Sequence, residues 1–179
     1  MCGLFKQADK YYFKNGERLG IDIKYSFEKE KELLGTGGAL KKAESKLEDE
    51  FLLLNGDTYL PINYKKLIDY FYRHKKIGVI TVYNNLDRIA PNNIKIDESN
   101  LVISYNKQNS KDMNYLDAGV MAFKKKVVNF IEKNKKISLE EQIFPKFIEL
   151  KEPIAYPINQ RFYDMGTFQG LKILEQILK

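Results

Sequence analysis

The sequence contains no tryptophan, one cysteine and one histidine. Because Cys2 has no second cysteine to pair with, we expect a protein of the reducing cytoplasm. His74 lies in the basic stretch 73–76 with no partner residue in the pattern, and we assign it no catalytic role. No apolar run approaches the ~20 residues of a membrane-spanning helix, and the first residues do not resemble a signal peptide. We therefore expect no membrane partner.

A net charge of +6 raises the question of nucleic-acid binding, but the distribution of that charge argues against it. The 30 basic residues are interspersed with 24 acidic ones, as in the stretch 28–32. The densest basic patch, residues 73–76, ends a predicted helix, where cations stabilise the helix dipole. We interpret the charge as a solvated surface and expect no nucleic-acid partner.

The length and the order of predicted elements indicate one domain, residues 1–179, of the α/β class. Strands that alternate with helices are typical of a mostly parallel sheet with helices on both faces. Two short alternating segments around residues 98–100 predict a β-hairpin. The predicted strands cover residues 21–25, 51–54, 77–83, 93–97, 101–105, 116–123 and 153–158, and the predicted helices cover residues 4–14, 37–47, 63–75, 124–133, 138–149 and 167–179.

Two acidic residues each close a predicted strand before a turn that contains Gly or Thr. Asp57 follows the apolar run 51–54, and Asp164 precedes Gly166 and the last predicted helix. Ligands of open α/β sheets bind at the carboxyl ends of the strands, and Mg²⁺ is typically held by one or two carboxylates plus substrate phosphates. A single Asp in Asn-Gly-Asp-Thr fits an ordinary turn, but two in the same setting indicate a shared metal site.

The glycine-rich loop 35–38 has two interpretations that the pattern alone leaves open. Glycines allow close approach to a ligand, and N–H groups at a helix start can donate to it. Alternatively, the loop only caps the helix that it opens. It is neither a Walker A loop nor a G-x-G-x-x-G motif. Lys107, after the predicted strand 101–105, has the charge to neutralise a phosphate, although from composition alone a surface role is favoured for a lysine in so basic a chain.

Five short motifs follow one another in a specific order along nearly the whole chain. They are L-G-T-G-G-A at 34–39, L-N-G-D at 54–57, D-A-G at 117–119, S-L-E-E-Q-I-F-P at 138–145 and Y-D-M-G-T at 163–167. In this order they resemble the motifs of sugar-1-phosphate nucleotidyltransferases. The similarity is greatest to the branch that contains mannose-1-phosphate and heptose-1-phosphate guanylyltransferases.

The resemblance implies a Rossmann-like nucleotidyltransferase fold with Mg²⁺ as cofactor. The implied reaction joins a nucleoside triphosphate, with GTP favoured, to mannose or heptose 1-phosphate, and gives a nucleotide sugar and pyrophosphate for surface polysaccharide or glycoconjugate synthesis. The implied catalytic residues are Asp57, Lys107 and Asp164, with both aspartates as metal ligands. The implied nucleotide-binding residues are Gly35, Thr36, Gly37, Gly38, Asn55 and Gly56, and the implied sugar-binding residues are Asp117, Ala118 and Gly119.

The chain departs from the family pattern at several points, three of which bear on the site and the fold. Asn106 stands where a Glu usually precedes the lysine, and Asp117 replaces the usual Asn, which adds negative charge near the sugar phosphate. The family's opening strand and its Gly-Gly-x-Gly-Thr-Arg loop have no counterpart in the sequence. We therefore expect an N-terminally truncated fold that is poorly stable alone, forms a homo-oligomer or is completed by another chain. A non-catalytic, sugar-nucleotide-binding subunit is the alternative to an active enzyme.

Overall fold

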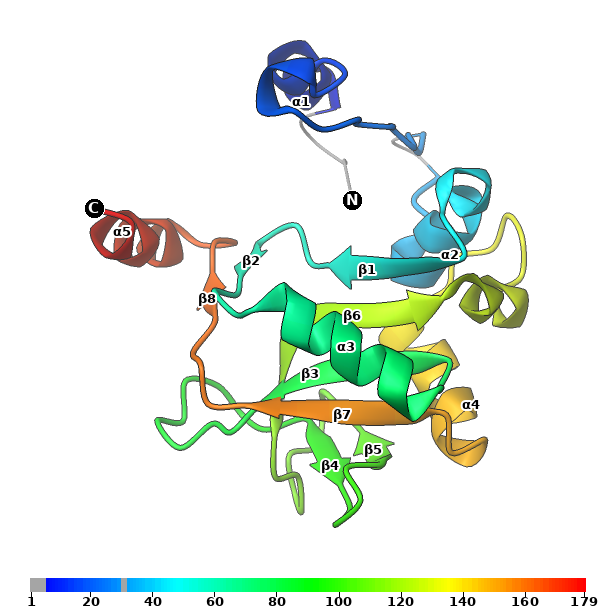
Figure 1. Ribbon diagram of the computed structural model, residues 1–179, viewed down its shortest axis with the longest axis vertical. Coiled ribbons are helices and arrows are strands. Elements are labelled where there is room, and N and C mark those ends of the chain that lie inside the picture. Colours follow the sequence, from blue (N-terminus) through cyan, green and yellow to red (C-terminus); the bar gives the residue numbers. More distant parts are fainter. Residues whose placement is uncertain (1–5, 30–31) are drawn as a thin grey trace.

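The computed structural model describes residues 6–29 and 32–179, and its centre is a four-stranded sheet (Figure 1). The strands are β1 (Glu50–Leu54), β2 (Thr58–Tyr59), β3 (Gly78–Tyr83), β4 (Ile94–Ile96), β5 (Val102–Tyr105), β6 (Leu116–Lys124), β7 (Pro153–Ile158) and β8 (Tyr163–Asp164). The α-helices are α1 (Lys6–Phe13), α2 (Gly35–Lys42), α3 (Tyr64–His74), α4 (Phe144–Glu149) and α5 (Phe168–Ile177). The short helical turns are η1 (Glu17–Leu19), η2 (Glu44–Lys46), η3 (Lys125–Phe130) and η4 (Leu139–Ile143).

The main sheet is mixed, with the strand order β1-β6-β3-β7. β3 and β7 pair in parallel, whereas β6 runs antiparallel to both β1 and β3. Three of the four strands thus share one direction, and β6 is inserted between them in the opposite one. The predicted α/β class with a Rossmann-like fold is confirmed. The sheet, predicted to be mostly parallel, is a mixed one in which only β6 runs in the opposite direction.

Helices cover both faces of the sheet, as expected. One face packs Val79, Tyr83 and Val120 against Leu67 and Phe71 of α3. The opposite face packs a second hydrophobic cluster that includes residues of α2, η3, η4, α4 and the β4–β5 hairpin. The continuous apolar run of β3 is buried along its whole length because it lies between these two clusters.

Helix α3 follows directly from local sequence signals. The Asn63 side chain accepts a hydrogen bond from the backbone N–H of Lys66, which satisfies one of the unpaired donors at the helix start. Leu67 and Phe71, four residues apart, lie on one side of the helix and are buried. The helix ends at Lys75, which adopts a left-handed conformation with φ 54°.

Two local features position the residues of the candidate site. A two-residue antiparallel ladder pairs β2 with β8 and sets Thr58 opposite Asp164. In β6, the register against β3 shifts between the pairs Ile80–Met121 and Val82–Asp117. Gly119 lies within this irregular stretch with φ 73°, a conformation that favours glycine. Such a bulge changes the direction in which neighbouring side chains point.

Four predicted elements differ from the structure. The predicted helix 37–47 is α2, which ends at Lys42, followed by the 3₁₀ turn η2. Residues 21–25 form no strand, because within the described part of the chain no strand pairs with them and alternation alone does not hold a strand in place. The predicted helix 124–133 is the shorter 3₁₀ segment η3, and the predicted helix 138–149 starts as the π-helical turn η4 before α4. The first residues of the predicted helix 4–14 lie outside the described residues.

β1 lies at one edge of the sheet, and among the described residues no strand pairs with its outer side. The side chains of β1 are only partly buried, and that of Leu54 is 47% exposed. Among the described residues, the strand before Asp57 thus has a paired neighbour on one side alone. Within the described residues, no helix has the length and apolar character to cross a bilayer.

Candidate active site

The two predicted metal ligands come together at the β2–β8 ladder. The backbone N–H of Met165 donates to the carbonyl oxygen of Asp57 at 2.6 Å, which ties the turn after β1 to the turn after β8. One carboxylate oxygen of Asp164 accepts the N–H of Gly166 at 2.7 Å. Both aspartates are exposed. The ladder therefore places two solvent-accessible carboxylates beside one another, although they are far apart in the sequence.

Gly166 marks the space between these carboxylates. A Cβ atom at this position would lie 3.0 Å from Oδ1 of Asp164 and 3.5 Å from Oδ2 of Asp57. A side chain here would fill the space toward which both carboxylates turn. Mg²⁺ is typically bound by one or two protein carboxylates together with substrate phosphates. Asp57 and Asp164 supply two such carboxylates with room between them. The residues therefore fit the implied cation.

A cavity of about 210 Å³ begins at the acid pair and is lined by half of the predicted site residues. Its lining is predominantly polar and comes from the ends of β1, β6 and β8 and from the segments beside the β4–β5 hairpin. It joins residues that the sequence separates by more than one hundred positions. The lining residues are Asn55, Asp57, Thr58, Asn93, Lys107, Asp117, Gly119, Phe162 and Asp164.

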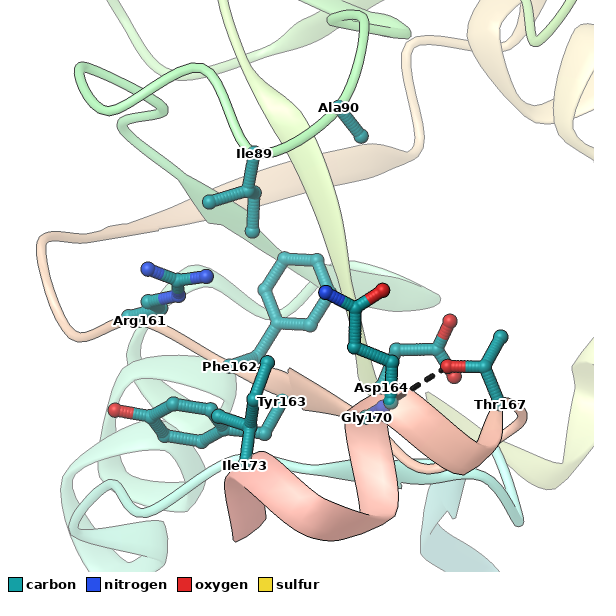
Figure 2. Close-up of a pocket in the computed structure, with 10 residues that line it drawn as sticks. Ile89, Ala90, Arg161, Phe162, Tyr163, Asp164, Thr167, Gly170 and Ile173 are labelled. Atoms are coloured by element: carbon teal, nitrogen blue, oxygen red, sulfur yellow. Dashed lines mark hydrogen bonds between the residues drawn. The ribbon is translucent and has the colours of Figure 1, made fainter. Parts of the chain in front are cut away.

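A second cavity, of about 250 Å³, shares Phe162 and Asp164 with the first (Figure 2). Ile89 and Ile173 give this cavity a more apolar wall. Thr167 at its rim accepts the N–H of Gly170 and thereby caps α5. The second cavity lacks Lys107 and Asp57, so the predicted phosphate-binding lysine and both predicted metal ligands line the first cavity.

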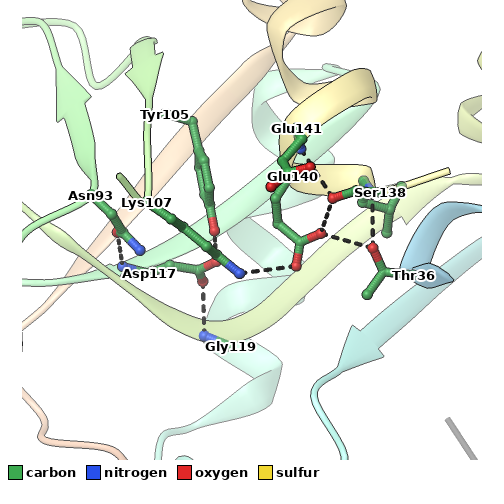
Figure 3. A network of polar contacts seen from close by, with 10 residues as sticks. Thr36, Asn93, Tyr105, Lys107, Asp117, Gly119, Ser138, Glu140 and Glu141 are labelled. Carbon is green, nitrogen blue, oxygen red and sulfur yellow. Dashed lines mark hydrogen bonds and ion pairs between the residues drawn. The ribbon is translucent and has the colours of Figure 1, made fainter. Parts of the chain in front are cut away.

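Asp117 is held at the wall of the first cavity by three hydrogen bonds (Figure 3). Its carboxylate accepts the hydroxyl of Tyr105 at 2.8 Å and the backbone N–H of Gly119 at 2.9 Å. Its own N–H donates to the side-chain oxygen of Asn93 at 2.9 Å. Burial raises the pKa of the Asp117 carboxyl, and the bonds from Gly119 and Tyr105 and the charge of Lys107 counteract this rise. Burial likewise raises the pKa of the Tyr105 hydroxyl, so Tyr105 donates.

Lys107 reaches this wall from the turn that follows β5. Asn106 shapes the turn, because its side-chain oxygen accepts the N–H groups of Gln108 and Asn109. The ammonium group of Lys107 forms an ion pair with Glu140 at 3.2 Å. Burial raises the pKa of Glu140, but the hydrogen bond from Thr36 and the charge of Lys107 outweigh burial and leave it below its ordinary value.

The glycine-rich loop does not line the cavity, and its glycines have a packing role. The N–H groups of Gly37 and Gly38 both donate to the carbonyl oxygen of Ile137, at 2.8 and 3.2 Å. A Cβ at Gly35 would lie 2.7 Å from that same oxygen, and one at Gly37 would lie 2.9 Å from the Ile137 side chain. The interpretation of the loop as a close-packed helix start thus has direct support. Its implied contact with a nucleotide base stays a prediction.

The structure brings together six of the predicted site residues around the cavity, namely Asn55, Asp57, Lys107, Asp117, Gly119 and Asp164. Ala118 is fully buried within β6, and Gly56 lies in the turn beside Asp57 without lining the cavity. The sequence interpretation missed Asn93, Tyr105 and Glu140. Glu140 belongs to the S-L-E-E motif, where an acidic first helical turn gave no sign of a long-range contact.

The comparisons with known proteins agree with this fold. The family model described as "Nucleotidyl transferase" matches residues 6–178. The chain belongs to this family. It is 35% identical over 158 residues to the D-glycero-alpha-D-manno-heptose 1-phosphate guanylyltransferase of Campylobacter jejuni. This match covers 88% of this chain and 68% of that protein. It is 28% identical over 165 residues to the mannose-1-phosphate guanylyltransferase catalytic subunit beta of Drosophila pseudoobscura, covering 90% of this chain and 44% of that protein.

Among solved structures, the nucleotidyl transferase fold of this chain is similar to that of HddC from Yersinia pseudotuberculosis. The TM-score is 0.74 at 25% identity, and the match covers 97% of this chain and 75% of that one. The chain thus spans about two thirds of the Campylobacter relative and less than half of the Drosophila relative. The nucleotidyl transferase region is shared with all three.

Proposed function

We propose that the chain is a sugar-1-phosphate guanylyltransferase, or the corresponding part of one, that joins GTP to heptose or mannose 1-phosphate. The observation that carries the proposal is the cavity in which Asp57, Asp164 and Lys107 meet beside Asp117. Carboxylates for a cation, an ammonium group for a phosphate and acceptors for sugar hydroxyls are the groups that this reaction needs. The names of the relatives support guanine as the base and heptose or mannose as the sugar.

In the proposed reaction, a phosphate oxygen of the sugar 1-phosphate attacks the α-phosphorus of the triphosphate in line. The bond between the α-phosphorus and its bridging oxygen breaks, and pyrophosphate leaves with the electron pair. No side chain needs to form a covalent intermediate, so the protein contributes positioning and charge stabilisation. A Mg²⁺ ion bound by Asp57 and Asp164 would supply charge neutralisation at the phosphates.

The residues of this chain have separate roles in this scheme. Lys107 binds an oxygen of the sugar phosphate and reduces the repulsion between two anionic reactants. Asp117 has lone pairs beyond the two that Tyr105 and Gly119 use, and these accept hydrogen bonds from sugar hydroxyls. Asn55 contributes an amide group to the same wall of the cavity. Asp57 and Asp164 hold the cation end.

The test is pyrophosphate release from GTP with heptose or mannose 1-phosphate, with and without Mg²⁺. We expect Mg²⁺-dependent release, GTP preferred over ATP, CTP and UTP, and a nucleotide sugar detected by mass spectrometry. Asp57→Asn and Asp164→Asn should each reduce the rate by about 100-fold, since each removes a charged cation ligand. Asp69→Asn, at an exposed position on α3, is the matched control. Full activity in Asp57→Asn would refute the assigned role.

A further inference from the structure

Glu140 connects two parts of the site that the sequence treats as separate (Figure 3). One carboxylate oxygen, Oε1, contacts the ammonium group of Lys107 at 3.2 Å. The other, Oε2, accepts the hydroxyl of Thr36 at 2.8 Å and that of Ser138 at 3.0 Å. A single carboxylate therefore joins the lysine at the cavity to the glycine-rich loop.

The two side chains of the ion pair between Lys107 and Glu140 differ in their exposure to solvent. The side chain of Glu140 is 15% exposed, whereas that of Lys107 is 53% exposed. A mostly buried carboxylate is stable only with hydrogen-bond donors or a cation beside it. Thr36 and Ser138 hold Glu140 in place whether or not Lys107 is paired. The exposed lysine is thus the partner that can leave.

Thr36 is constrained from both sides. Its hydroxyl oxygen accepts a hydrogen bond from the N–H of Leu139 at 2.9 Å, and the same hydroxyl group donates a hydrogen bond to Glu140. The adjacent N–H groups of Gly37 and Gly38 donate to Ile137. Hydrogen bonds thus connect the start of α2 to the segment that carries Glu140. A change in the hydrogen bonding of Glu140 therefore changes the hydrogen bonding of the glycine-rich loop.

We propose that Glu140 is a positioning residue that couples the glycine-rich loop to the phosphate-binding lysine. In the ligand-free chain it holds Lys107 at the cavity wall. When a ligand phosphate takes the ammonium group, the carboxylate is left to Thr36 and Ser138, whose hydrogen bonds to it tighten. Occupancy of the phosphate position therefore changes the geometry of the loop. This inference rests on the proposed function only in taking Lys107 as the phosphate-binding group.

The test follows backbone amide signals of the ¹⁵N-labelled full chain by NMR during titration with inorganic phosphate. In the unmodified chain we expect the amides of Lys107 and Thr36 to shift with one apparent Kd. In Glu140→Gln the Lys107 amide still shifts, with a Kd about two- to fivefold lower because phosphate no longer displaces a carboxylate. The Thr36 amide no longer responds in that variant.

Glu141→Gln is the matched control, because Glu141 is exposed in the same helical turn and only its backbone N–H contacts Ser138. It should behave as the unmodified chain does. Thr36→Val removes the hydroxyl that donates to Glu140. In this variant, too, the amide of residue 36 should not respond to phosphate. The inference is overturned if phosphate shifts neither amide of the unmodified chain, if Thr36 still responds in Glu140→Gln, or if both Glu140→Gln and Thr36→Val unfold, which would make the role structural.

The outcomes separate this inference from the proposed function. Coupled shifts without nucleotidyl transfer would contradict the guanylyltransferase proposal and support the role of Glu140. Nucleotidyl transfer without coupled shifts would support the guanylyltransferase proposal and contradict the role of Glu140.

Discussion

Asp117 shows how a single residue at the cavity wall makes stability depend on pH. Burial raises the pKa of its carboxyl above the ordinary 3.8. The folded chain therefore keeps this proton to higher pH than the unfolded chain does. Between the two pKa values, the contribution of Asp117 to the free energy of unfolding falls as pH rises. Above that window, the fold contains a buried anion that depends on its hydrogen-bond donors.

Tyr105→Phe removes one of those donors, the hydroxyl that Asp117 accepts at 2.8 Å. We expect a loss of about 1.5–3 kcal/mol in the free energy of unfolding above the pH window of Asp117, where the carboxyl is ionised. The loss should be smaller below that window, where the folded chain holds the proton. Urea unfolding on both sides of the window measures this difference. Tyr11→Phe, at an 83% exposed position, is the control, and an equal loss on both sides would contradict the assignment.

Helix α2 depends on a close approach to the segment before η4. A Cβ at Gly38 would meet the Lys135 carbonyl oxygen well inside van der Waals contact and the Leu34 side chain at 2.7 Å. Gly38→Ala should therefore lower the free energy of unfolding by about 1–3 kcal/mol. Lys42→Ala, exposed on the same helix, should change it by less than about 0.5 kcal/mol. Comparison of urea midpoints decides, and an unchanged midpoint for Gly38→Ala would rule out the packing role.

Elements with local signals were predictable from the sequence, and elements that depend on distant partners were not. The predicted helix 63–75 is α3, which begins at the local Asn63 cap, and the alternation on either side of residues 98–100 defined the β4–β5 hairpin. The alternation at 21–25 looked equally good but has no partner strand among the described residues. A strand is stabilised by its neighbour, and one sequence window does not contain that neighbour.

The same distinction holds for the candidate site. Asp57 and Asp164 were recognisable because each has its own turn motif, and the β2–β8 ladder joins them. The link between Glu140 and Lys107 was not predictable, because it arises from packing between a helical turn and a hairpin. The glycine-rich loop was recognised for its glycines, but the closeness of Ile137 that requires them is visible only in three dimensions.

For the whole molecule, the outer side of β1 has the largest consequence. An exposed strand edge with partly buried apolar side chains is a template for association between chains. We expect concentration-dependent self-association in light scattering, and Leu54→Lys should reduce it. Leu86→Lys, at an 83% exposed position in the loop after β3, is the control and should leave it unchanged. Equal effects of both variants would point to net charge as the cause.

The hydrogen bond between Met165 and Asp57 joins two segments that are synthesised at different times. Domains fold as the chain emerges from the ribosome, and β1 emerges early, while β8 follows after more than half of the chain has been added. Until then Asp57 has no acidic partner. The proposed cation position is therefore among the last features to form, and cation affinity measured on nascent chains of increasing length should appear only once residue 164 has left the exit tunnel.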